Sequence, residues 1–202
     1  MTATLRSLLI IGPPGVGKGT QGKVLGAIPG LVHHSSGDVF RSLDKVSDLG
    51  RTFLSYSTKG ELVPDGLTIE IWRSDADRRI ETGEFDPATD LLILDGIPRN
   101  PTQAALMDEH VDVLGIILLV AKNEQELIDR LRKRAEKEDR PDDADETVIR
   151  RRLEVYEDAT RPLLGHYDTA LIHEVDALGT PAEVARRVLD VVIPVQASLA
   201  TA

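Results

Sequence analysis

The sequence predicts an α/β fold, a doubly wound parallel five-stranded sheet flanked by helices and carrying a small helical insert. Two observations support this prediction. Short apolar runs alternate with helical patterns along most of the 202 residues, as expected where crossover helices connect parallel strands. The first apolar run leads directly into a glycine-rich loop, after which a helical segment begins. The length fits a single domain, residues 1–202, with a core of ordinary size.

The expected strands are short and rich in Leu, Ile and Val, which is typical of buried strands. They span residues 8–11, 31–34, 91–94, 115–121 and 170–175. Helical periodicity lies between them, at residues 18–26, 66–81, 102–109, 124–138, 146–159 and 181–193. Trp72 is expected to pack in the core, and the tail after Pro194 is expected to fray.

One stretch interrupts the alternation. Between Ser35 and Asp65 the pattern gives two short helical pieces, at residues 37–43 and 49–58, with no strand between them. In a doubly wound sheet, such an insert is expected above the carboxyl edge, where ligands bind.

The glycine-rich loop runs from Gly12 to Thr20 and predicts a phosphate-binding site. Its Gly-x-x-x-x-Gly-Lys spacing matches the P-loop, in which backbone N–H groups and a helix N-terminus surround phosphates while Lys18 adds a positive charge. Most P-loops place Ser or Thr directly after the lysine to hold magnesium, but here Gly19 follows and the hydroxyl comes one place later. A glycine turn without a ligand is the alternative, which the preceding strand disfavours.

A second signal is the apolar run that ends in Asp95, because it places a carboxylate at the same sheet edge as the P-loop. There Asp95 can hold a magnesium-bound water, although most isolated Asp-Gly pairs only begin a turn. Arg99 follows in a Gly-x-Pro-Arg turn, and Gln103 lies one helical turn later. An amide can donate and accept at once, as reading an adenine edge requires.

The insert carries the third signal. Its first serines are candidate helix N-caps, and Arg41 lies one turn into the helix, where it could meet a phosphate. The segment from Lys59 to Asp65 closes the insert with a turn that can expose backbone groups to a base.

The fourth signal is a series of arginines. Arg130 and Arg134 share one helix face, Arg140 lies in a short polar loop, and three arginines occupy residues 150–152. Solvated helix faces with weak ion pairs are the alternative for any one of them. As a series they favour phosphoryl transfer, which needs clustered cations.

Composition limits the possible partners. The formal net charge is −10, which argues against nucleic-acid or acidic-membrane binding. The ligand that the P-loop implies is nevertheless polyanionic, so the cations must be concentrated at one site. The chain has no cysteine and its histidines lack metal-ligand spacing. With no early signal or membrane segment in the sequence, a cytoplasmic protein is expected.

Taken together, these motifs resemble the adenylate kinases and their nucleoside monophosphate kinase relatives. The motifs are Gly-Pro-Pro-Gly-x-Gly-Lys-Gly-Thr, Ser-Ser-Gly-Asp-x-x-Arg, Lys-Gly-x-Leu-Val-Pro-Asp, Asp-Gly-x-Pro-Arg and Arg-x-Asp-Asp. Their order covers residues 8–193, and Gly19 is a feature of this family. The resemblance implies reversible phosphoryl transfer from MgATP to AMP, giving two ADP, by a monomer. It also implies a mobile NMP-binding insert at residues 35–64 and a short lid at residues 134–144.

The resemblance also assigns roles by position. The residues implied to bind ATP are Gly15, Val16, Gly17, Lys18, Gly19, Thr20, Arg130, Arg134 and Gly179. Those implied to bind AMP are Ser36, Arg41, Glu61, Leu62, Val63, Gly96, Ile97, Pro98, Arg99, Gln103, Arg140 and Arg152. The implied catalytic groups are Lys18, Arg99, Arg134, Arg140 and Arg152, with Asp95 holding Mg²⁺ through water.

This sequence departs from the family pattern in places. Only five residues separate Arg134 from Arg140, so the extended lid, and with it any zinc site, is missing. The family also places one arginine after the lid, and two residues are candidates for it here. The distance from Arg140 indicates Arg151, whereas the Arg-Leu-x-x-Tyr register indicates Arg152, and we favour Arg152. Ile97 replaces a usual Phe and Ser36 a usual Thr.

Two alternatives remain open. A kinase for UMP or CMP is one, because such relatives also carry Asn after Pro-Arg, as Asn100 does here. A nucleotide-binding sensor without catalysis is the other. A sensor should have gaps among its phosphate-binding cations, whereas all are present in this chain.

Overall fold

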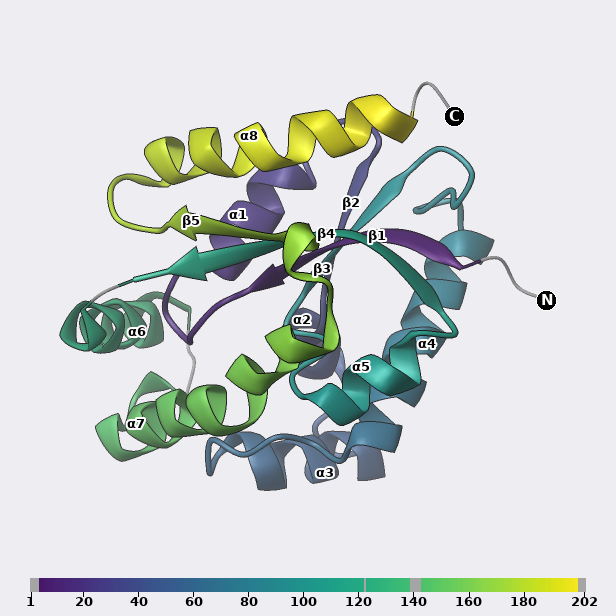
Figure 1. Ribbon diagram of the computed structural model, residues 1–202. Coiled ribbons are helices and arrows are strands. Elements are labelled where there is room, and N and C mark those ends of the chain that lie inside the picture. Colours follow the sequence, from purple (N-terminus) through teal and green to yellow (C-terminus); the bar gives the residue numbers. More distant parts are fainter. Residues whose placement is uncertain (1–3, 122, 139–142, 200–202) are drawn as a thin grey trace.

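The computed structural model describes residues 4–121, 123–138 and 143–199. Its centre is a five-stranded sheet in the order β2-β3-β1-β4-β5, with every neighbouring pair parallel. The strands are β1 (Leu5–Ile11), β2 (Leu31–Ser35), β3 (Leu91–Asp95), β4 (Val111–Val120) and β5 (Ile172–Asp176). Helices cover both faces, so the predicted fold class is confirmed (Figure 1).

The alternation of side chains along each strand produces two apolar cores, one on each face. In β1, Leu8 and Ile10 belong to one core and Leu9 and Ile11 to the other. The first core is completed by α1 (Lys18–Leu25) and α8 (Pro181–Leu199), and by residues of α6 (Glu124–Glu138) and α7 (Glu146–Val155). The second is completed by α4 (Asp65–Glu81) and α5 (Pro101–Met107), on the opposite side of the sheet in Figure 1.

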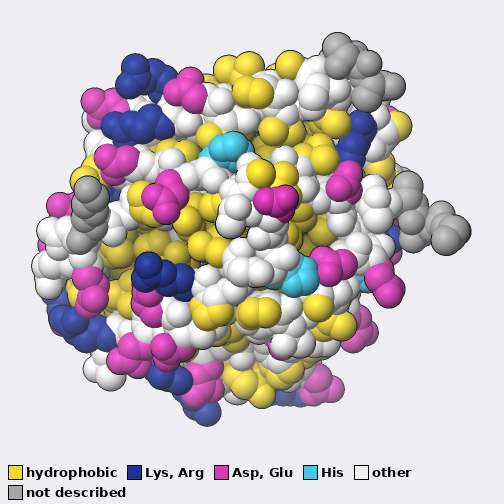
Figure 2. Space-filling model, viewed as in Figure 1, with side chains coloured by type: hydrophobic (Ala, Val, Ile, Leu, Met, Phe, Trp, Pro, Cys, Tyr) yellow, Lys and Arg dark blue, Asp and Glu magenta, His cyan; other side chains and the backbone are white. Residues whose placement is uncertain are grey.

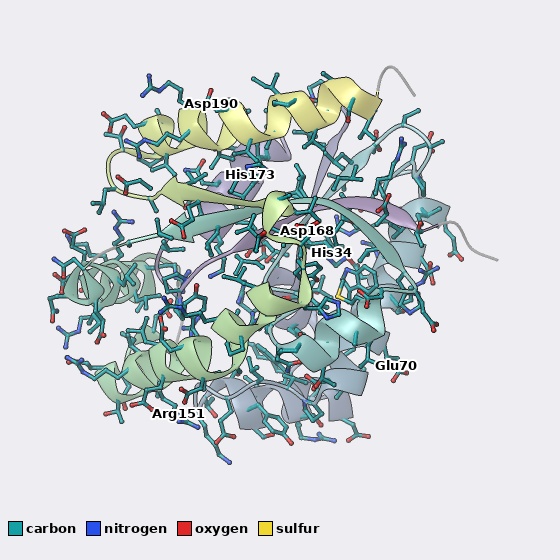
Figure 3. The ribbon with its side chains drawn as sticks, in the orientation of Figure 1. His34, Glu70, Arg151, Asp168, His173 and Asp190 are labelled. Carbon is teal, nitrogen blue, oxygen red and sulfur yellow. The ribbon has the colours of Figure 1, made fainter. Side chains whose placement is uncertain are left out.

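Trp72 on α4 is 1% exposed, which confirms its predicted place in the core. Next to it lies His34 of β2, labelled in Figure 3, whose ring meets the indole edge-on at a centroid distance of 6.3 Å. The His34 Nε2 atom lies 2.9 Å from an Asp75 carboxylate oxygen, and this contact holds the pKa of Asp75 below its usual range. The second core is therefore tied to α4 by a polar contact as well as by apolar packing.

The interruption between β2 and α4 is helical, as the sequence predicts, and consists of α2 (Ser36–Ser42) and α3 (Asp48–Ser57). Both helices have a serine N-cap. The Ser35 hydroxyl accepts from the Asp38 backbone N–H at 3.2 Å, and the Ser47 hydroxyl caps α3 in the same way at 3.0 Å. Phe40 and Phe53 stack between the two helices at 5.2 Å.

The segment predicted to be a lid, residues 134–144, begins within α6 (Glu124–Glu138) and ends just before α7 (Glu146–Val155). Residues 139–142, including Arg140, lie outside the described residues. Acidic and basic side chains are interspersed over these helices in Figure 2. Arg150 illustrates the pattern, because it contacts Glu124 on α6 at 3.2 Å and Glu146 on its own helix at 2.7 Å.

The structure corrects the predicted helix over 146–159. The α-helix ends at Val155, a π-helical turn follows over Tyr156–Thr160, and a 3₁₀ helix occupies Arg161–His166. Pro162 lies in this second segment, and its missing N–H prevents a continuous α-helical ladder there. Another 3₁₀ turn, Thr169–Leu171, takes up the start of the predicted last strand.

The expected fraying after Pro194 was also wrong. Helix α8 continues through the proline to Leu199 because its last turn is held by tertiary contacts. Val195 and Leu199 pack against the first core, and the Gln196 side chain donates to the Pro29 carbonyl at 3.1 Å. Within the described residues, no helix combines the length and the apolar character needed to cross a bilayer.

Candidate active site

A cleft of about 600 Å³ opens at the carboxyl edge of the sheet, where the P-loop, the insert, the turn after β3, and parts of α6, α7 and α8 face one another. The predicted site residues that line it are Gly15, Val16, Gly17, Lys18, Gly19, Thr20, Ser36, Arg41, Glu61, Leu62, Val63, Asp95, Gly96, Pro98, Arg99, Gln103, Arg130, Arg134, Arg152 and Gly179. Ile97 does not line it, because its side chain is 2% exposed and belongs to the second core.

The P-loop connects β1 to α1 in close contact with α6. Gly15 has φ +81°, and a Cβ there would lie 2.8 Å from the Leu127 carbonyl oxygen, so only glycine fits this approach. Gly17 forms the N-cap of α1 in a left-handed conformation without a side-chain cap. The first N–H groups of a helix have no partner within it, so the start of α1 offers donors to an anion.

Lys18 turns back over this loop. Its Nζ donates to the Gly12 carbonyl at 2.6 Å and to the Pro13 carbonyl at 3.1 Å. Burial lowers the pKa of Lys18 to about 7, against the opposing effect of Asp95, and Arg99, Arg152 and Arg134 lower it further. The three arginines are therefore close enough to disfavour a positive charge on Lys18, and a bound polyanion would relieve that repulsion.

Asp95 ends β3 with its carboxylate against the start of α1. A Cβ on Gly19 would lie 3.5 Å from an Asp95 oxygen, which is ordinary contact, and His33 Nε2 lies 3.4 Å from the same oxygen. Asp95 is 6% exposed and faces the cleft among Lys18 and the arginines. Among residues 4–121, 123–138 and 143–199, no three His, Cys, Asp or Glu side chains gather in a group that could hold a metal ion.

On the insert side, one carbonyl organises two of the predicted residues. The Gly96 oxygen accepts from the Ser36 hydroxyl at 2.7 Å and from Arg99 Nε at 2.7 Å. Gly96 itself has φ +78°, and a Cβ there would meet the Ser36 oxygen at 2.9 Å. Because Ser35 is the N-cap of α2, Ser36 is the serine that reaches across to the turn after β3.

Arg41 lines the same side of the cleft from α2. Its guanidinium contacts Asp38 at 2.5 Å, and about a third of its side chain, 35%, is exposed. Gly60, at the end of the insert, is buried against α7, where a Cβ would lie 3.0 Å from the Val148 carbonyl oxygen. The insert and α7 therefore meet directly beside residues 61–63.

Gln103 lies at the base of this pocket and is 1% exposed. Its Oε1 accepts from the Arg99 backbone N–H at 2.8 Å, and its Nε2 donates to Asp65 Oδ1 at 2.8 Å. Asn100 Nδ2 donates to the same Asp65 oxygen at 2.8 Å. Sequence reasoning missed this use of Asp65, although Asp65 ends the Lys-Gly-x-Leu-Val-Pro-Asp motif.

Asp143 joins Arg134 of α6 to Arg152 of α7 beside the predicted lid. Its buried carboxylate accepts from Arg134 Nε at 2.6 Å and from Arg152 Nη1. Arg151, by contrast, is half exposed, contacts Glu154 at 3.2 Å, and lies on the outer side of α7 (Figure 3). The geometry thus places Arg152 in the cleft, in keeping with the register that the sequence favours. Sequence reasoning did not foresee this bridging carboxylate.

Comparison with known proteins finds similarity to one family along nearly the whole chain. Residues 10–172 match the family model described as Adenylate kinase. The adenylate kinase of Thermus thermophilus is 38% identical over 189 residues, which covers 91% of this chain and 95% of the relative. The chain belongs to the adenylate kinase family. The adenylate kinases of Thermobifida fusca, 38% identical over 90% of this chain and 95% of the relative, and of Flavobacterium psychrophilum, 34% identical over 92% and 97%, are similar along the same extent.

Membership of the adenylate kinase family fits the way the motifs are gathered. The matched residues run from β1 to the start of β5 and so include the P-loop, the insert and both helices beside the lid. Within this framework, Arg130 places its guanidinium 3.4 Å from the Ala177 carbonyl, close to Gly179 at the rim of the cleft.

We predict that Lys18→Met makes the free energy of unfolding less dependent on pH. The unfolded chain keeps this lysine protonated up to its ordinary pKa of 10.5, whereas the folded chain releases the proton above about 7. The unfolded state therefore binds more protons in this window, and wild-type stability rises with pH by up to about 1.4 kcal/mol per unit. The variant should lack that contribution, as measured by urea unfolding at about pH 7, 8 and 9.

Lys23→Met, which removes an exposed lysine from the last turn of the same helix, is the matched control. It should follow the wild-type pH dependence. If the stability of Lys18→Met changed with pH in parallel with that of wild type, the lowered pKa of Lys18 would be contradicted.

Proposed function

We propose that this member of the adenylate kinase family transfers the terminal phosphoryl group of MgATP reversibly to AMP, giving two ADP. The observation that carries the proposal is one cleft in which a P-loop faces an arginine-bearing insert across a cluster of cations. We further propose that the protein is a monomer and acts in the cytoplasm. The names of the relatives support the same reaction.

The donor half of the site is the P-loop side. Backbone N–H groups from Gly15 to Thr20 bind the phosphates of ATP, while Lys18 exchanges its two carbonyl partners for phosphate oxygens. Arg130 and Gly179 lie together at the rim, where the base of ATP binds. Arg134 approaches the phosphates from the lid side.

The acceptor half is the insert side. Arg41 and Arg99 bind the phosphate of AMP, and Gln103 reads its adenine. The remaining residues proposed to line this half are Ser36, Glu61, Leu62, Val63, Gly96, Ile97 and Pro98, with Arg140 and Arg152 on the lid side. For Ile97, whose side chain is in the core, this role falls to its backbone.

The residues at the P-loop also fit magnesium. Asp95 presents a nearly buried carboxylate where the phosphates enter, with no competing hydroxyl at Gly19. Oxygen ligands of this kind suit Mg²⁺, which keeps several waters and takes phosphates as further ligands. Bound with ATP, the ion would neutralise charge on the phosphate oxygens, and Asp95 would hold it through a water.

This arrangement promotes transfer by positioning and by charge. Phosphoryl transfer spreads negative charge over the moving group, so its rate depends on cations fixed around that group. Lys18, Arg99, Arg134 and Arg152 supply them, with Arg140 from the lid. We propose that the insert, residues 35–64, and the short lid, residues 134–144, close over both nucleotides and exclude water.

An assay of each nucleoside monophosphate with MgATP tests the proposal. We expect turnover with AMP to exceed turnover with UMP and CMP, because Gln103 offers a donor and an acceptor to the base. A coupled assay of ADP formation measures all three. Faster turnover of UMP or CMP would identify a pyrimidine monophosphate kinase, and nucleotide binding without turnover would identify a sensor.

Arg152→Ala should lower kcat by about a thousandfold or more, because it removes a cation from the moving phosphoryl group. Arg151→Ala is the matched control, since this neighbouring arginine is half exposed, pairs with the exposed Glu154 and does not line the cleft. Its kcat should stay within about twofold of wild type. Equal losses in the two variants would refute the assignment of Arg152.

Arg41→Ala should raise the KM for AMP by about tenfold to a hundredfold and leave the KM for ATP nearly unchanged, because a charge-assisted phosphate contact is lost on the acceptor side only. The insert supplies a close control in Arg51→Ala. Both arginines pair at 2.5 Å with an aspartate three residues earlier, but Arg51 does not line the cleft. Steady-state kinetics with each substrate varied in turn distinguishes the two variants. A similar rise in the KM for AMP in both would contradict the role of Arg41.

A further inference from the structure

We propose that Asp65 is a positioning residue that fixes the amide of Gln103 in one orientation, and that this orientation makes the acceptor site prefer 6-aminopurine over 6-oxopurine monophosphates. The inference rests on the proposed function, because it concerns the acceptor of the same reaction. It assigns to Asp65 a control of base selectivity that Asp65 exerts through Gln103.

The contacts around Gln103 leave its amide one satisfied orientation. Oε1 faces the Arg99 backbone N–H, and Nε2 faces Asp65 Oδ1, both at 2.8 Å. A backbone N–H can only donate and a carboxylate can only accept. A flipped amide would point NH₂ at a donor and oxygen at an anion, so it would lose both hydrogen bonds at a side chain that is 1% exposed. Two lost bonds at a buried site disfavour the flipped form by about a hundredfold.

Asn100 strengthens this arrangement from the other end of the same turn. Its Nδ2 donates to the Asp65 oxygen that Gln103 also uses, at 2.8 Å, and its Oδ1 accepts from the Gln103 backbone N–H at 2.7 Å. Asp65 is the first residue of α4, and Gln103 lies in the first turn of α5. The network therefore holds the backbone and the side chain of Gln103 between two core helices.

The fixed amide has chemical consequences for the base. An amide nitrogen has two hydrogens and an amide oxygen two lone pairs, so one donor and one acceptor remain for a ligand in the cleft. Adenine donates from its 6-amino group and accepts at ring nitrogen N1. Hypoxanthine and guanine instead accept at O6 and donate from their N1–H group. A locked amide matches the first pattern and opposes the second. Sites that hydrogen-bond a substrate in this way discriminate strongly between analogues.

The experiment compares kcat/KM for AMP and IMP. Wild type should prefer AMP, and Asp65→Ala should lower the AMP-to-IMP ratio by about tenfold or more, because the amide can then turn to suit either base. Asp65→Asn should restore most of the ratio, since its carbonyl oxygen can accept from both amides. Asp48→Ala is the matched control: Asp48 is also the first residue of a helix, α3, but is exposed and pairs with Arg51. Its ratio should equal that of wild type.

A double-mutant cycle separates positioning from stability. In a Gln103→Ala background, Asp65→Ala should cause no further change in the ratio. If Asp65→Ala does not fold, Asp65→Ser provides the same test, because serine is favoured at helix starts and its hydroxyl is too short to replace the carboxylate. Equal losses of kcat/KM for AMP and IMP, or a lower ratio in the Gln103→Ala background as well, would overturn the proposal.

The same measurements distinguish failure of this inference from failure of the proposed function. If wild type phosphorylates AMP but the ratio does not respond to Asp65, the inference alone is wrong. If wild type phosphorylates no monophosphate, the function is wrong. Calorimetric titration of wild type and Asp65→Ala with AMP and with IMP then decides the inference, since an unchanged binding ratio would overturn it.

Discussion

The site depends on holding several positive charges close together in a cleft of an acidic protein. Burial lowers the pKa of Lys18, and Arg99, Arg152 and Arg134 lie near enough to lower it further. Such a cluster is unfavourable unless fixed acceptors offset it. Two buried carboxylates, Asp95 and Asp143, and a few backbone carbonyls offset part of this charge. A polyphosphate is the kind of ligand that this cleft stabilises most.

The parallel sheet brings these groups to one place. Every strand ends at the same edge, so the P-loop after β1, the turn after β3 and the rim beyond β5 become neighbours although they lie far apart in the sequence. The two cores hold the edge rigid because alternate residues of each strand pack on opposite faces. The insert and the helices beside the lid then need only local contacts to face this edge of the sheet. The approach of Gly60 to α7 is one such contact.

Local chemistry made much of this predictable from the sequence. A glycine-rich loop after a strand, or an aspartate at the end of one, has a meaning set by a few neighbouring residues, and the predicted strands and helices fell close to their observed positions. Prediction failed where distant contacts decide. Pro194 usually ends a helix, but packing of Val195 and Leu199 carries α8 past it. Likewise, the pairing of Asp143 with arginines on two helices depends on their approach in space, which spacing along the chain does not reveal.

The two elements proposed to recognise AMP, one for its base and one for its phosphate, also differ in how firmly they are held. Gln103 is held by hydrogen bonds in a buried network between core helices, where each lost bond leaves an unsatisfied polar group. Arg41 pairs with Asp38 near solvent, and an exposed ion pair of this kind contributes at most about 1 kcal/mol. Arg41 can therefore exchange its aspartate for a phosphate at little cost, whereas the amide proposed to read the base is held in one orientation. In the proposed closure, Arg41 on the insert thus approaches the phosphate of an AMP molecule whose base is already bound at the firmly held Gln103.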